Sequence, residues 1–167
     1  MTRNHEISNE DGLLIPKGSR TGTVAGVAVG KERGTSKKQT PYIDLKDGYG
    51  VLGDGHAGTE KQVSLVAVEE IDHMNRTYNL QAHIGDFAEN IATRGIDLMS
   101  FSPGDQIQIG PAILEIVRIG KDPEEMKMHT FSFEGYTLLP KKGLFCEVIK
   151  SGRVRPGDKI SAICKST

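Results

Sequence analysis

Residues 106–119 read QIQIGPAILEIVRI, and this stretch decides the class of fold. Polar and apolar side chains alternate strictly over 106–109, and Pro111 begins a second run rich in isoleucine and leucine. Alternation with a period of two places one set of side chains on the core face of a β-strand and the other set in solvent. The stretch therefore predicts two strands, of which the second returns along the first.

Further short segments of this kind extend in both directions along the chain. Glycine accounts for 20 of the 167 residues, which favours many turns between short strands. Residues 69–79 are the best helix candidate, because Val68, Ile71, Met74 and Tyr78 recur three or four positions apart. We expect a mainly β fold, a barrel or a sandwich with one or two short helices. The further predicted strands are 21–29, 39–45, 63–68, 85–91, 144–149 and 157–163.

The sequence predicts one domain. Residues 1–20 are polar and without periodicity, so we expect a flexible arm or an edge strand there. No linker divides residues 21–167, and that length suits a single domain with its own core.

Composition narrows the set of partners. The net charge is −1, so no overall field attracts nucleic acid or an anionic membrane, and we expect neither as a partner. No apolar run approaches the ~20 residues of a membrane helix. The N-terminal residues lack the apolar core of a secretory signal, and two cysteines make no disulfide framework. We therefore expect a cytoplasmic protein.

Residues 53–58, GDGHAG, are the first candidate for a binding site. Glycines let a backbone approach a ligand and can leave N–H groups facing an anion. Asp54 and His56 are alternate residues and would share one face of an extended segment. Such a group could hold a phosphate, a polar heterocycle or a centre of proton transfer; the alternative is a turn whose Asp and His cap backbone groups. The candidate residues are Gly53, Asp54, Gly55, His56, Gly58, Lys61 and Gln62.

Residues 85–91, GDFAENI, are the second candidate. In an extended strand, Asp86, Ala88 and Asn90 would share one face, and Glu89 would lie on the apolar face. A buried, unpaired carboxylate is costly. We therefore expect Glu89 to form an ion pair, and the candidate cations are Arg94, Arg118 and Lys121.

The cysteines and histidines give weaker signals. Cys146 alternates with Leu144 and Val148, which is typical of a small core residue, although nearby lysines could activate its thiol. Cys164 has a weaker claim to chemistry. The five histidines show no metal-ligand spacing and there is no Cys-x-x-Cys, so no protein-ligated metal is expected.

Taken in order, five segments resemble the MOSC domain, the module named after the C-terminal part of molybdenum-cofactor sulfurase. The resemblance implies a largely β, barrel-like fold and a link to the molybdenum cofactor, a pterin dithiolene that bears a phosphate. The matching segments are GDGHAG (53–58), KQVSL (61–65), IGDFAENIATRGIDL (84–98), PGDQIQIGPAILEIVRIGK (103–121) and KKGLFCEVIKSGRVRPGDKI (141–160).

The resemblance also implies where a ligand would bind. GDGHAG, Lys61 and Gln62 would line part of a polar cleft, and Asn90, Thr93 and Arg94 would face the same cleft. Many family members carry a cysteine shortly after the segment that ends in Ile-Gly-Lys; here the chain reads GKDPEEMKMH (120–129), without a cysteine, and so departs from the family pattern. Cys146, the candidate catalytic thiol, lies instead in the last predicted hairpin.

Three functions follow from the resemblance. The first is binding or carriage of the pterin cofactor. The second is sulfur transfer through a persulfide on Cys146, with a protein as sulfur donor. The third is an adaptor that docks on a molybdoenzyme. The sequence does not decide whether the protein is an enzyme.

Overall fold

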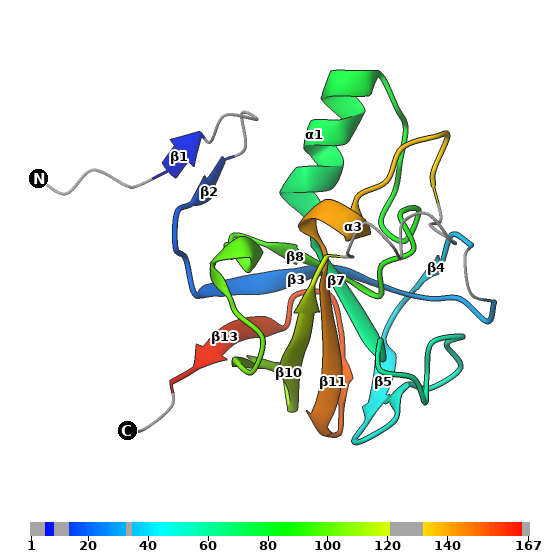
Figure 1. The fold of residues 1–167 in the computed structure, drawn as a ribbon, viewed down its shortest axis with the longest axis vertical. Coiled ribbons are helices and arrows are strands. Elements are labelled where there is room, and N and C mark those ends of the chain that lie inside the picture. The colour runs from blue at the N-terminus through cyan, green and yellow to red at the C-terminus, as the bar shows by residue number, and fades with distance from the viewer. Residues whose placement is uncertain (1–5, 9–13, 33–34, 121–131, 165–167) are drawn as a thin grey trace, which may run out of the picture.

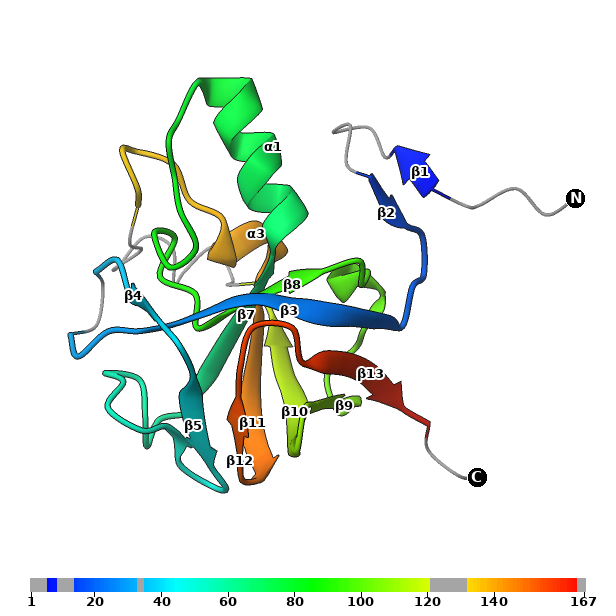
Figure 2. The ribbon, with the colours of Figure 1, turned by 180° about the vertical axis from the view of Figure 1, so that it is seen from behind.

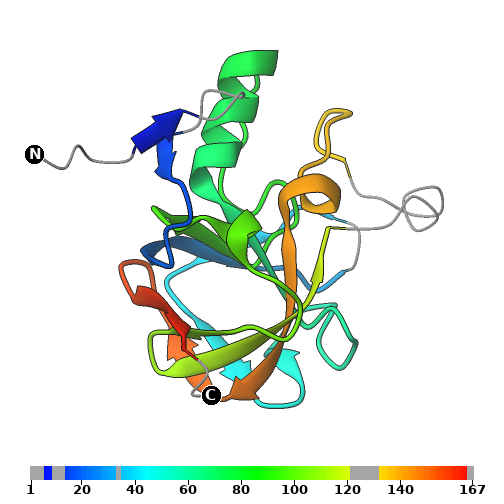
Figure 3. The same ribbon diagram turned by 60° about the vertical axis from the view of Figure 1, so that its left-hand side comes forward.

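The computed structural model describes residues 6–8, 14–32, 35–120 and 132–164, and its centre is a closed β-barrel (Figures 1 and 3). Seven strands run round the barrel in the order β13-β9-β10-β11-β7-β8-β3, and β13 pairs again with β3 to close it. The mainly β, barrel-like fold predicted from the sequence is confirmed. The barrel strands are β3 (Thr21–Val29), β7 (Val63–Ala67), β8 (Ile91–Arg94), β9 (Gln106–Ile109), β10 (Ala112–Ile119), β11 (Leu144–Lys150) and β13 (Lys159–Ile163).

The hairpin predicted from residues 106–119 is β9 and β10. The two strands are antiparallel, with Leu114 opposite Ile107 and Ala112 opposite Ile109. These four apolar side chains are buried in the barrel, whereas Gln108 is exposed. The alternation of the sequence therefore corresponds to the inside and outside of the barrel wall.

One helix makes the crossover between two parallel strands. The helix α1 (Val68–Tyr78) follows β7 directly and leads to β8, which runs parallel to β7. The helix predicted over residues 69–79 is confirmed, and its bounds agree to within one residue at each end. A second helix, α3 (Leu139–Lys142), precedes β11, and a 3₁₀ turn, η1, covers Leu98–Ser100. Figure 2 shows α1 projecting from one end of the barrel.

The prediction of a strand over residues 85–91 is wrong. Residues 84–87 form a turn, and β8 begins only at Ile91. The carboxylate of Glu89 accepts the backbone N–H of Gly85 at 2.7 Å and that of Phe87 at 3.2 Å, which folds the segment back on itself. Ala88 has φ of 69°, so the backbone is not extended there. The expected two-faced arrangement of Asp86, Ala88 and Asn90 therefore does not exist.

Smaller sheets flank the barrel. A three-stranded sheet has the order β12-β5-β6, and a separate pair, β1 with β2, lies near the N-terminus (Figure 1). The predicted strand at 39–45 is divided between β4, at the edge of β3, and β5. Residues 122–129, DPEEMKMH, for which the sequence is compatible with a helical turn or a surface loop, lie outside the described residues. The bounds are β1 (Glu6–Ser8), β2 (Leu14–Pro16), β4 (Lys38–Thr40), β5 (Ile43–Lys46), β6 (Gly50–Val51) and β12 (Gly152–Val154).

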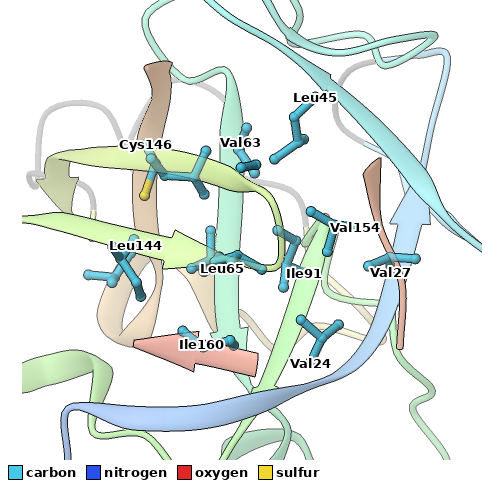
Figure 4. Close-up of a cluster of buried hydrophobic side chains, with 14 of the residues drawn as sticks. Val24, Val27, Leu45, Val63, Leu65, Ile91, Leu144, Cys146, Val154 and Ile160 are labelled. Atoms are coloured by element: carbon cyan, nitrogen blue, oxygen red, sulfur yellow. The ribbon is translucent and has the colours of Figure 1, made fainter. Parts of the chain in front are cut away.

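Two apolar clusters lie on the two sides of the barrel wall. Aliphatic side chains fill the interior, among them Leu65, Ile91 and Leu144, with Cys146 in the same cluster (Figure 4). A second cluster contains Val66 and Phe145, which point to the other side of the same strands. No helix in the described part of the chain is long and apolar enough to span a membrane.

Candidate functional site

The GDGHAG segment is a tight turn whose backbone donors are used within the protein. The N–H of Gly55 donates to the carbonyl of Gly30 at 2.7 Å, and the N–H of Gly58 donates to the carbonyl of Tyr49 at 2.7 Å. Gly53 and Gly58 have φ of 86° and 80°, where other residues are strained. The expectation that the N–H groups of these glycines face an anion is therefore wrong for Gly55 and Gly58.

Asp54 is a buried anchor. Its Oδ1 lies 2.7 Å from the ammonium of Lys37, and the two side chains are 0% and 1% exposed. Its Oδ2 accepts the backbone N–H of His56 at 3.1 Å. Burial pushes the pKa of Asp54 upward, but the bonds from Lys37 and from the backbone outweigh it, and the pKa is lowered. The predicted shared face of Asp54 and His56 required extended backbone, and the turn does not provide it.

Asn90 and Gln62 also hold the fold together. The amide of Asn90 donates to Oδ1 of Asp54 at 3.1 Å and its Oδ1 accepts the N–H of Ser64 at 3.1 Å. Oε1 of Gln62 accepts the N–H of Val148 at 3.0 Å. Both residues are buried. The two amides therefore join strands and loops rather than line a cleft.

Thr93 and Arg94 lie far from Lys61. Thr93 is opposite Ala67 at the end of the parallel β7–β8 pair, whereas Lys61 stands two residues before the start of β7. Six residues of extended chain separate Lys61 from Ala67, or roughly 20 Å. Thr93 is fully buried and Arg94 is exposed. The expectation that Lys61 and Arg94 share a cleft is wrong, because parallel pairing places them at opposite ends.

Glu89 is buried, and its carboxylate is bonded to the backbone. The described residues place no cation within ion-pair distance of its carboxylate, which is bonded to the N–H groups of Gly85 and Phe87. Arg94 and Arg118 are therefore not its partners, and Lys121 lies outside the described residues. Burial raises the pKa of Glu89 to about 7, against the effect of the two backbone hydrogen bonds.

The two thiols lie in opposite surroundings. Cys146 is 0% exposed among the aliphatic side chains of the barrel interior, and burial raises its pKa well above the ordinary range (Figure 4). Cys164, which follows β13, is exposed. A thiol must be accessible and ionised to attack sulfur. The proposed catalytic role of Cys146 therefore finds no support in this environment.

A cleft of about 300 Å³ opens on the outer side of the barrel wall. Phe145, buried, pairs across the sheet with Arg118 of β10 and with Ser64 of β7. The ammonium of Lys61 lies 5.5 Å from the centre of the Phe145 ring. The cleft thus brings two cations to one aromatic ring. The lining residues are Glu60, Lys61, Val117, Arg118 and Phe145.

Lys61 is a candidate from the sequence, whereas Arg118 is expected there only as a partner for Glu89, which the structure does not show. The available signal was a lone arginine near the end of the apolar strand AILEIVRI, which we interpreted as a partner for Glu89. Arg118 lies near Lys61 because β10 pairs with β11 and β11 pairs with β7. The spacing of the two residues in the sequence does not predict this. No cluster of three metal-ligating side chains occurs within the described ranges.

Comparison with solved structures places the fold among known ones. The chain is similar to the YuaD protein of Bacillus subtilis, with 21% identity and a TM-score of 0.64 over 87% of this chain and 97% of that one. YiiM of Geobacillus stearothermophilus gives 17% identity and a TM-score of 0.64, and the match covers 85% of this chain and 75% of that one. YiiM of Escherichia coli gives 18% identity and a TM-score of 0.58, and the match covers 87% of this chain and 71% of that one.

Comparison with sequences identifies the family. No curated protein sequence matches the chain. The family profile of the MOSC domain, however, matches residues 53–161, which include the GDGHAG turn, α1 and every barrel strand except β3 and the end of β13. The protein belongs to the MOSC domain family.

Proposed function

We propose that this protein binds the molybdenum cofactor, or its pterin precursor, in the cleft between Lys61 and Arg118. The observation that carries the proposal is the pair of cations on either side of Phe145. A guanidinium binds a phosphate through two parallel hydrogen bonds, and an ammonium adds a point charge. Membership of the MOSC domain family supports the molybdenum cofactor as the class of ligand.

The volume and the lining of the cleft also suit a small ligand that has a ring and a phosphate. Its volume of about 300 Å³ is at the lower end of the usual range for small-molecule sites. Phe145 provides an apolar surface, while Lys61 and Arg118 provide positive charge. A ring system against the phenyl group and a phosphate against the cations would use both features.

The residues fit the phosphate-bearing part of the cofactor and do not supply a thiolate ligand for its metal. The chain has two cysteines, of which Cys146 is buried inside the barrel and Cys164 is exposed after β13. Neither lines the cleft. When bound, the cofactor itself supplies the dithiolene sulfur and the metal. The protein would hold and orient it through charge, so binding would be reversible and sensitive to salt.

Expression in cells supplied with molybdate tests the proposal. We expect the purified protein to carry molybdenum and a pterin that fluoresces after oxidation. The molybdenum and pterin contents of the double variant Lys61→Ala/Arg118→Ala should be lower by at least about tenfold, because two charge-assisted contacts are removed.

A matched variant controls for charge. Lys38→Ala/Arg155→Ala also removes two exposed cations, on β4 and after β12, and should retain the cofactor of the parent. Equal molybdenum and pterin contents in the parent and in Lys61→Ala/Arg118→Ala would contradict the proposal, as would their absence from the parent.

A further inference from the structure

One face of the small sheet β12-β5-β6 gathers exposed apolar side chains. Six large apolar side chains are exposed in the described part of the chain, and three of them are on or beside this sheet: Tyr42 at 42%, Tyr49 at 40% and Leu52 at 49%. In β5, Ile43 and Leu45 point inward and are buried, so Asp44 and Lys46 point to the opposite face. Figures 1 and 2 show β5 at the end of the barrel away from α1.

The register of the sheet shows that these side chains are neighbours. Arg153 of β12 is opposite Asp44 of β5, and the N–H of Leu52 donates to the carbonyl of Asp44 at 2.9 Å. The strand pairing therefore aligns Leu52, Asp44 and Arg153 across the sheet. We call this the tyrosine face, and its residues are Tyr42, Asp44, Lys46, Tyr49, Leu52 and Arg153.

Both tyrosine rings are held by a cation of the same chain. The guanidinium of Arg153 lies 3.8 Å from the centre of the Tyr42 ring, and the ammonium of Lys46 lies 5.8 Å from that of Tyr49. Arg153 also binds Asp44 through two hydrogen bonds, of 2.8 and 3.1 Å. Side chains that are already ordered lose less entropy on association, and tyrosine and arginine dominate the binding energy of many interfaces.

The charges of the tyrosine face select the kind of partner. A face with cations alone would select an acidic partner, but Asp44 stands between Lys46 and Arg153. A face that carries both signs is complementary to its own copy, because a two-fold axis brings the anion of each copy to the cation of the other. The net charge of −1 opposes such self-association very little.

We propose that the tyrosine face is the contact surface of a symmetric homodimer of this chain. A two-fold axis near Asp44 brings the carboxylate of each copy beside Arg153 of the other. The rings of Tyr42 and Tyr49, with Leu52, then lose water at the centre of the contact. This inference is independent of the cofactor proposal, since none of these residues lines the cleft.

Light scattering coupled to gel filtration tests the proposal. We expect the parent to have the mass of a dimer, and Leu52→Glu to weaken the dimer at least about tenfold, because it places a charge in the apolar centre. The control Tyr78→Glu changes a similarly exposed side chain on α1 and should leave the parent mass unchanged.

A charge exchange tests the two-fold arrangement itself. Asp44→Arg and Arg153→Asp each place like charges opposite one another in a homodimer, so each alone should be monomeric. An equimolar mixture restores opposite charges at both contacts and should form the dimer. Circular dichroism checks that each variant is folded.

Three results would overturn the proposal. A parent that is monomeric up to millimolar concentration has no such dimer. A parent dimer that Leu52→Glu does not weaken uses another face. A mixture of the two charge variants that is no tighter than either alone rules out the placement of Asp44 against Arg153.

Discussion

The ammonium of Lys37 and the carboxylate of Asp54 lie 2.7 Å apart, and both side chains are almost completely buried. Asp54 also accepts the N–H of Gly30 at 3.0 Å and the amide of Asn90 at 3.1 Å. One carboxylate thus joins the end of β3, the residues before β4, the GDGHAG turn and the approach to β8. The GDGHAG turn, the first candidate for a ligand site, is therefore held in place by a buried ion pair within the protein.

Loss of the Asp54 charge should destabilise the protein strongly. In Asp54→Asn, Lys37 remains buried without a counter-ion, and we expect the free energy of unfolding to fall by about 3–5 kcal/mol. Urea denaturation measures this. Asp47→Asn is the matched control: Asp47 is exposed, and the loss should be far smaller. Similar losses in both variants would contradict a special role for the buried pair.

The same pair should contribute to stability only above acidic pH. The pKa of Asp54 is lowered in the folded state, so its contribution is complete above the unfolded pKa, near 4, and is lost as the pH falls through the folded pKa. The difference in unfolding free energy between the parent and Asp54→Asn should therefore shrink on acidification below about pH 4. A difference that is constant with pH would show that Asp54 has the same pKa in the folded and unfolded states.

Glu89 should have the opposite pH dependence. Its pKa is raised from 4.5 to about 7 by burial, so the folded state holds the proton more tightly than the unfolded state. Its contribution is therefore complete below pH 4.5 and is lost as the pH rises to about 7. Between these two pH values, the free energy of unfolding of the parent should fall by on the order of 3 kcal/mol more than that of Glu89→Gln.

Urea denaturation of the parent and of Glu89→Gln at several pH values makes the comparison. Glu147→Gln, on β11, removes a carboxylate that is only partly buried and should follow the parent curve. Coincident curves for the parent and Glu89→Gln would mean that Glu89 titrates alike in both states.

The thiols should differ sharply in reactivity. We expect a thiol alkylator to label Cys164 in the native protein and Cys146 only after unfolding, because Cys146 is fully buried. Peptide mapping by mass spectrometry distinguishes them. Cys146→Ser should cost about 1–3 kcal/mol, since a hydroxyl would be buried in an apolar interior. Rapid native labelling of Cys146 would restore it as a candidate sulfur carrier.

Gly85 should be irreplaceable, unlike Gly95. Both have positive φ, 95° and 81°, but a Cβ on Gly85 would collide with the carbonyl oxygen of Lys37, whereas one on Gly95 meets nothing within 4 Å. Gly95→Ala should cost about 1–2 kcal/mol from backbone conformation alone. Gly85→Ala should cost more than about 3 kcal/mol, measured by thermal and urea unfolding. Equal costs would show that the backbone relaxes around Gly85.

The sequence by itself determined the elements with regular periodicity. The alternation of residues 106–119 predicted β9 and β10, and the three- and four-residue spacing of Val68, Ile71 and Met74 predicted α1. These patterns reflect local geometry, because the side chains that share a face are close neighbours in the sequence. The interior position of Cys146, between Leu144 and Val148, follows from the same rule.

Only the tertiary structure decided which polar residues face a ligand and which support the fold. Asp54 has Lys37 as its partner, and Lys61 shares its cleft with Arg118, a neighbour brought close by β-sheet pairing. Glu89 binds the backbone just before it and so removes the strand that alternation had suggested. The physical reason is that the energy of a polar side chain depends on its burial and on its partners, and long-range strand pairing sets both.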